Sequence, residues 1–194
     1  MICVGVCGRG SERVAAQICG KYSDAGIDAE RYSGSESDAE FGLFLAKMEK
    51  AGKKVVISET SVKNDRRKFD LLLVISAEKG KTAQLKNIRK NGCVIINADD
   101  CGAFVIPPGT AVVTCGVNSS AAVTFSGIGE NRDGRESVQC CIQKEIRTVS
   151  GRKIEPQEFS INIVGKYPLS EVLAIIALAI AGDIEETVTS DVLV

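Results

Sequence analysis

The chain has 194 residues, 44% of them hydrophobic, which is enough for one substantial hydrophobic core. Its 24 lysines and arginines are interleaved with 25 aspartates and glutamates, so no uniformly basic face is expected and nucleic acid is disfavoured as a partner. The longest apolar stretch, residues 172–181, falls short of the roughly 20 residues that a membrane-spanning helix needs, and no signal-peptide pattern opens the chain. We therefore expect a soluble cytoplasmic protein with no membrane partner.

The available residue types restrict the chemistry further. The eight cysteines form no C-x-x-C pair, so a zinc site is not expected, and most of them stand in apolar surroundings typical of reduced, buried thiols. A redox or metal-binding function is the alternative, and it requires Cys3 and Cys7 to face a shared space. Histidine is absent, which removes the commonest general base and metal ligand.

The first half of the chain alternates strands and helices. Apolar runs predict strands over residues 1–6, 53–59, 69–75 and 93–97, and helical spacing predicts helices over residues 12–22 and 41–52. Residues 82–91 are expected to form a short basic helix that ends at Gly92. Its basic stretch, which begins at Lys79 and Lys81, is expected to be a solvated face that could also recognise an acidic partner.

The second half has a different pattern. Short alternating runs at residues 112–115, 122–126, 138–142 and 159–164 predict an antiparallel sheet, and a final helix begins near Pro168 and stops at Gly182. The sequence thus predicts an α/β fold: a mostly parallel sheet flanked by helices, with a smaller antiparallel sheet in the second half. We expect one domain over residues 1–194, divided into an α/β part (1–110), an antiparallel part (111–164) and a C-terminal helix with a tail (165–194).

A glycine-rich turn joins the first strand to the first helix. This geometry can hold a phosphate, because the first N–H groups of a helix are unpaired and the helix dipole is positive there. The same turn also occurs without any ligand, and that reading stays open. The nucleotide-hydrolysing form G-x-x-x-x-G-K-[ST] would begin at Gly5, and Ser11 and Glu12 then stand where the lysine and the hydroxyl belong. Another register keeps a cation, Arg9 after Gly8, but places Gly10 at the hydroxyl position.

The segment Val4-Gly5-Val6-Cys7-Gly8-Arg9-Gly10-Ser11-Glu12-Arg13 resembles, without a gap, the I-G-V-T-G-T-N-G-K-T loop of the Mur ligase family and of its folylpolyglutamate and cyanophycin synthetase relatives. In this register Glu12 replaces the lysine. The segment Val56-Ile57-Ser58-Glu59-Thr60-Ser61 is similar to the family strand that ends in E-x-S-S. The resemblance implies that Glu59 corresponds to the carboxylate that helps to hold magnesium.

Two further segments carry the resemblance along the chain. Gly92 to Asp100 is similar to the family element G-x-v-v-x-N-x-D-D, with Asn97, Asp99 and Asp100 at its polar positions. Gly165 to Glu171 stands where the family has G-x-H-N-x-x-N before a helix of the adenine pocket. Gly165 agrees with that motif, whereas Tyr167, Pro168 and Glu171 replace the three polar ligands.

The resemblance implies the fold of the central, ATP-binding domain of a Mur ligase, without the domains for the growing precursor and the incoming amino acid. It implies an altered nucleotide or anion site formed by Gly8, Arg9, Gly10, Ser11 and Arg13, with Glu59 as a magnesium ligand and ATP with magnesium as the cofactor. The replaced residues favour a non-catalytic domain that binds an anionic small molecule or a protein partner, as an accessory to cell-wall or polyamide synthesis. The alternative is an ATP-dependent amide ligase or ATPase that separate protein partners complete with the missing domains.

Overall fold

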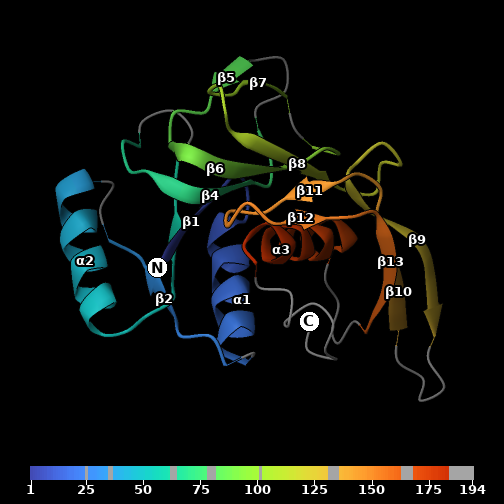
Figure 1. The fold of residues 1–194 in the computed structure, drawn as a ribbon, viewed down its shortest axis with the longest axis horizontal. Coiled ribbons are helices and arrows are strands. Elements are labelled where there is room, and N and C mark those ends of the chain that lie inside the picture. The colour runs from blue at the N-terminus through green and yellow to red at the C-terminus, as the bar shows by residue number, and fades with distance from the viewer. Residues whose placement is uncertain are drawn as a thin grey trace.

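A computed structural model describes residues 1–24, 26–34, 37–61, 65–77, 82–100, 102–130, 136–162 and 168–183 (Figure 1). The elements are, in chain order, β1 (Ile2–Cys7), α1 (Ser11–Asp24), β2 (Ala29–Tyr32), α2 (Asp38–Lys50), β3 (Val55–Glu59), β4 (Phe69–Val74), β5 (Thr82–Gln84), β6 (Ile88–Asn97), β7 (Ala103–Val105), β8 (Ala111–Cys115), β9 (Val123–Glu130), β10 (Glu136–Ile142), β11 (Ile146–Arg147), β12 (Lys153–Ile154), β13 (Gln157–Asn162) and α3 (Leu169–Ala181).

One large sheet organises the molecule. Its nine strands lie in the order β13-β10-β9-β8-β6-β4-β1-β3-β2, and all neighbours from β8 to β2 are parallel. Because the strands of this part run in one direction, their carboxyl ends meet at a single edge. The predicted fold class, a mostly parallel sheet flanked by helices with a smaller antiparallel sheet, is confirmed.

The parallel strands are buried on both faces, and successive side chains alternate between two hydrophobic cores. Val4 and Val6 of β1 join the core that contains α1 and α3, whereas Cys3 and Cys7 join the core on the face covered by α2. Figure 1 shows α2 standing apart from α1 and α3. A strand buried on both faces is apolar along its whole length, which is why these strands could be read from continuous apolar runs.

The antiparallel strands β9, β10 and β13 extend the central sheet instead of forming a separate one. The sequence predicts β8 to be antiparallel, but it pairs in parallel with β6 and, through Cys115 and Val123, with β9, so the strand direction changes only at β10. The apolar alternation of β8 identifies a strand but carries no information on its partner. The separate antiparallel sheet is a two-stranded pair, β11 with β12, which lies beside α3 (Figure 1).

The helix expected over residues 82–91 is wrong. These residues form β5, which pairs in parallel with β7, and the start of β6, where Ile88 pairs with Phe69 of β4. Leu85 and Ile88 are the buried apolar residues of the segment. Their spacing of three residues is compatible with a helix and also with an extended chain that buries each residue separately. Pairing with distant strands decides between these structures, and the local sequence cannot specify it. Lys79 and Lys81 lie outside the described residues.

The last helix is confirmed. Every residue of α3 from Glu171 to Ala181 is buried, and the helix contacts β4, β6, β8 and β9 of the central sheet as well as β11. A helix that is apolar around its whole circumference requires such a buried position. Within the described part of the chain, no helix has the length and apolar character needed to cross a membrane.

Candidate functional site

The turn between β1 and α1 is tightly fixed against β4. Gly8 and Gly10 have positive φ angles of 114° and 81°, a conformation that glycine adopts without strain. A Cβ atom on Gly8 would lie 2.6 Å from the backbone nitrogen of Ser76, so this position also requires the absence of a side chain. The backbone N–H of Arg9 donates to Ser76 Oγ at 2.8 Å. Ser11 then begins α1, whose amino end faces the turn.

A pocket of about 470 Å³, which we call the loop pocket, opens beside this turn. It lies at the carboxyl edge of the parallel strands, where ligands of open α/β sheets commonly bind. The residues that line it come from the turn, from the segments after β4, β6 and β8, and from the start of α3: Arg9, Gly10, Arg13, Ile75, Ser76, Asn97, Asp99, Asp100, Val117, Leu169, Ser170 and Glu171. Seven of the predicted site residues are therefore brought together: Arg9, Gly10, Arg13, Asn97, Asp99, Asp100 and Glu171.

Two arginines contribute positive charge to the loop pocket, and they differ in their contacts. Arg13 forms an ion pair with Oε1 of Glu171, which joins α1 to the first turn of α3. Arg9 is exposed, and among the described residues no carboxylate lies within ion-pair distance of its guanidinium group. Arg9 is therefore the cation of this pocket that is free to meet an incoming anion.

The polar residues at the end of β6 and after it have structural contacts within the protein. The carboxylate of Asp99 accepts backbone hydrogen bonds from Val117 at 2.7 Å and from Asn118 at 3.0 Å, and so fixes the loop after β8. Asn97 is buried, and its Oδ1 atom accepts the backbone N–H of Asp99 at 3.1 Å. The backbone oxygen of Asp100 accepts a hydrogen bond from Ala77. These contacts place Asn97 and Asp99 as supports for the wall of the pocket.

Glu59 lies outside this lining and forms part of a separate ion cluster. A nitrogen of the Arg31 guanidinium lies 2.5 Å from Oε1 of Glu59 and 3.6 Å from Oε1 of Glu12. The hydrogen bond that Glu59 accepts raises the pKa of Arg31 above its ordinary value. The acid that replaces the expected lysine and the acid at the expected magnesium position thus share one arginine from β2. Gly165, the remaining predicted position, lies outside the described residues.

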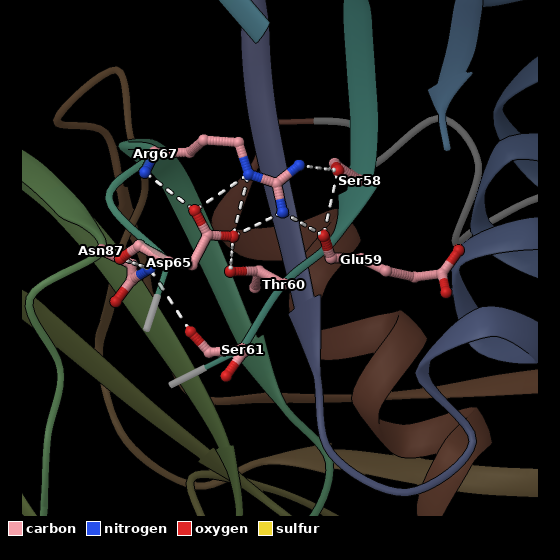
Figure 2. A network of polar contacts seen from close by, with 7 residues as sticks. All are labelled: Ser58, Glu59, Thr60, Ser61, Asp65, Arg67 and Asn87. Carbon is pink, nitrogen blue, oxygen red and sulfur yellow. Dashed lines mark hydrogen bonds and ion pairs between the residues drawn. The ribbon is translucent and has the colours of Figure 1, made fainter. Parts of the chain in front are cut away.

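A buried polar network next to this ion cluster was not predicted from the sequence. The Arg67 guanidinium pairs with the Asp65 carboxylate and also donates to Ser58 Oγ at 2.7 Å and to the backbone oxygen of Glu59 at 2.6 Å. Figure 2 shows Arg67 at the centre of these contacts, with the Glu59 side chain extending away from it. The network fixes the carboxyl end of β3 and hence the backbone from which Glu59 projects.

The same network is joined to its surroundings by further contacts. Thr60 Oγ1 donates to Asp65 at 2.5 Å, and Asn87 Nδ2 donates to the backbone oxygen of Asp65 at 2.7 Å. The guanidinium carbon of Arg67 lies 5.2 to 5.7 Å from three aromatic ring centroids, those of Tyr32, Phe41 and Phe69. Such cation–π contacts help to accommodate a charge that is removed from water. Residues 65–68 signal their charge in the sequence, but nothing in the pattern marks Arg67 as buried.

The cysteines are free thiols wherever the structure describes them, and five of the seven are buried. Burial raises the pKa of Cys3 to about 11 and that of Cys93 to about 12. Cys3 and Cys7 occupy opposite ends of β1 and belong to one hydrophobic core. Asp70 lies beside Cys3 and accepts its backbone N–H, but burial keeps the Cys3 thiol protonated, and a protonated thiol is a poor nucleophile and a poor metal ligand.

A mostly parallel sheet with a glycine-rich turn at its carboxyl edge defines a class of α/β domains that place their ligand site at this turn. No protein-family model matches the sequence, and no characterised protein matches it by sequence. Solved structures do match the fold. UDP-N-acetylmuramoyl-L-alanyl-D-glutamate–2,6-diaminopimelate ligase superimposes with a TM-score of 0.64 and 13% identity, over 99% of this chain and 46% of that protein.

Two further ligases have the same fold. MurF ligase from Thermotoga maritima in complex with ADP superimposes with a TM-score of 0.56 and 13% identity, over 99% of this chain and 48% of the ligase. A murein peptide ligase from Psychrobacter arcticus superimposes with a TM-score of 0.56 and 11% identity, over 97% of this chain and 46% of the ligase. The chain therefore has a Mur-ligase-like fold and spans about half the length of these ligases. The resemblance inferred from the sequence is confirmed at the level of the fold.

Proposed function

We propose that this domain binds an anionic small molecule of the nucleotide type in the loop pocket and does not catalyse ligation. The observation that carries the proposal is the position of Arg9. Its guanidinium group has no acidic partner among the described residues and lines a pocket of about 470 Å³ at the amino end of α1. A guanidinium group beside a helix amino terminus suits a phosphate or a carboxylate.

The ion cluster around Arg31 supports the second half of the proposal. Phosphoryl transfer with magnesium depends on a lysine at the terminal phosphates and on oxygen ligands for the metal. Here Glu12 stands at the position of that lysine, and the Glu59 carboxylate is engaged by Arg31. Glu12 would also repel a terminal phosphate. The domain is accordingly proposed to act as a binding module, as an accessory to cell-wall or polyamide synthesis.

Isothermal titration calorimetry with ATP in the presence of a chelator tests the binding. We expect the wild-type chain to bind and Arg9→Ala to bind at least about tenfold more weakly, because one charge-assisted contact is lost. Arg9→Ala is the more specific test of binding, because Arg13→Ala would also leave the buried Glu171 carboxylate without its partner. Arg147→Ala removes an exposed arginine on β11 and serves as the control. Equal affinities of Arg9→Ala and wild type would contradict the proposed site.

The second candidate is an ATP-dependent carboxylate–amine ligase component that other subunits complete. It is favoured by the shared fold with three ligases, one of them solved with ADP, and by the chain covering about half of each. Magnesium-dependent release of phosphate from ATP separates the two candidates. Turnover by the chain alone, or on addition of proteins that supply the missing domains, would favour this second candidate and remove the first.

A further inference from the structure

A second and larger pocket, of about 690 Å³, lies at the opposite edge of the parallel sheet. We call it the N-edge pocket, because it is formed where β1 and β3 begin, at the first half of β6, and at the end of α3. The loop pocket lies at the carboxyl ends of the same strands, and the linings of the two pockets share no residue within the described chain. A ligand in one pocket therefore does not exclude a ligand in the other.

Part of the lining of the N-edge pocket is apolar and packs against the core, and we call this part its floor. Ile2, Ile27 and Val149 line it, and all three are partly buried against the core that contains α1 and α3. Val55 of β3 completes this surface and is buried. Apolar side chains that remain partly open to solvent at the bottom of a pocket favour the apolar part of a ligand.

The charged residues around this floor differ in whether they are free to contact a ligand. Both acids are already engaged: Asp70 accepts hydrogen bonds from Arg89 and from the backbone N–H of Cys3, and Asp183 accepts them from Ser150 and Arg152.

Lys54 and Lys90 also line the pocket, and both are exposed. Neither lysine has an ion-pair partner in the part of the chain that the structure describes. The charge left available to a ligand is therefore positive.

The backbone is also unusual at this place. Asn91 and Asp183 are the non-glycine residues of the described chain with positive φ angles, 64° and 60°, and both line the N-edge pocket. Asn91 lies where the pairing of β6 with β4 shifts register, and Asp183 follows the end of α3. Sparsely populated backbone conformations and strand irregularities are enriched near binding sites.

We propose that the N-edge pocket is a second binding site, for an organic anion that carries one carboxylate, phosphate or sulfonate group on an apolar body. The apolar body would lie on the floor of Ile2, Ile27 and Val149. The acidic group would be held by Lys54 and Lys90. This inference is independent of the function proposed for the loop pocket.

A fluorescence titration with anilinonaphthalene sulfonate, an apolar anion, tests the site. Phenylnaphthylamine, which has a similar apolar body without the acidic group, is the uncharged comparison. We expect the double variant Lys54→Gln/Lys90→Gln to bind the sulfonate at least about tenfold more weakly than wild type and to bind the amine equally well. Lys47→Gln/Lys50→Gln on α2 makes the same change in net charge at two exposed lysines that do not line the pocket, and it should leave both affinities unchanged.

Each outcome is decisive. A loss of sulfonate binding confined to the Lys54/Lys90 variant would support the site, provided that its melting temperature stays at the wild-type value. An equal loss in both double variants, or no loss in either, would overturn it. An Arg9→Gln variant that abolished sulfonate binding would assign the dye to the loop pocket and overturn the inference as well. If the Lys54/Lys90 variant did not fold, Val149→Trp would replace it and should displace both dyes by filling the floor.

Discussion

Asp65 and Arg67 form an ion pair whose side chains are 0% and 2% exposed. Removing one member of a buried pair leaves the other charge in a poorly solvated place without compensation. Arg67 would keep its contacts to Ser58 and to the backbone of Glu59, but neither of these groups is charged. Replacing either member of the pair should therefore lower the free energy of unfolding strongly.

Asp65→Ala should lower the free energy of unfolding by about 3 to 5 kcal/mol, as is typical of a broken buried ion pair. Urea denaturation followed by circular dichroism measures this change. Asp24→Ala is the control, because the Asp24 carboxylate is 60% exposed and lies 4.0 Å from Lys21, an ion pair expected to contribute less than about 1 kcal/mol. A similar small loss for both variants would show that the buried pair is not a major stabilising contact.

The Asp65 carboxyl should also make stability depend on pH. Burial by itself would raise the pKa of Asp65, but hydrogen bonds from Arg67 and Thr60 together lower it below the ordinary value of 3.8. A depressed pKa in the folded state means that the stabilisation is complete above the unfolded pKa and is lost as the pH falls through the folded pKa.

Between about pH 6 and about pH 2.5, the free energy of unfolding of Asp65→Asn should therefore fall less steeply than that of the wild type. The slopes are compared, since the variant is less stable at every pH. Urea denaturation at several pH values gives both slopes. Parallel curves would mean that Asp65 has the same pKa in the folded and unfolded chain.

At the scale of elements, the turn between β1 and α1 depends on the conformation of Gly8. Its positive φ angle and its approach to the backbone of Ser76 leave no room for a side chain. Gly20 offers a matched comparison, since it lies within α1 with open space where a Cβ would stand.

Gly8→Ala should lower the free energy of unfolding by about 1 to 3 kcal/mol because of strain at this backbone position. Gly20→Ala should raise it by about 0.5 to 1 kcal/mol, because alanine favours a helix interior. Thermal and urea unfolding of the two variants test whether the free energy of unfolding falls in Gly8→Ala and rises in Gly20→Ala. A Gly8→Ala variant as stable as wild type would mean that the turn is free to move away from β4.

Elements with a strong local signal could be predicted. β1, β3 and β4 are continuous apolar runs, and α3 is an apolar segment bounded by Pro168 and Gly182. β2 was not predicted, because four residues at the sheet edge carry too short a pattern. The local sequence of β5 and the start of β6 predicts a helix, whereas the structure of this segment depends on pairing with distant strands.

At the scale of the whole molecule, the parallel sheet explains why the site could be predicted in part. The carboxyl ends of parallel strands meet at one edge, so the turn after β1 and the polar residues after β6 had to converge in the loop pocket. The partners of individual side chains could not be predicted in this way. Arg31 reaches Glu59 because β2 lies next to β3, and Arg13 reaches Glu171 because α3 packs beside α1.

The same sheet separates two proposed sites, one at each edge. Arg9 is the free cation of the loop pocket, and Lys54 and Lys90 are those of the N-edge pocket, within the described residues. We propose that the loop pocket holds an anion through the charge of Arg9, without the lysine and metal ligands of a phosphoryl-transfer site.

The most direct test of this claim is a pair of calorimetric titrations of the wild-type chain with ATP, one in a chelator and one in magnesium, with phosphate release followed in the second. We expect binding of similar affinity in both titrations and no phosphate release above the rate of ATP alone. Binding that requires magnesium and is accompanied by steady phosphate release would contradict this claim and would establish the domain as a nucleotide-hydrolysing enzyme.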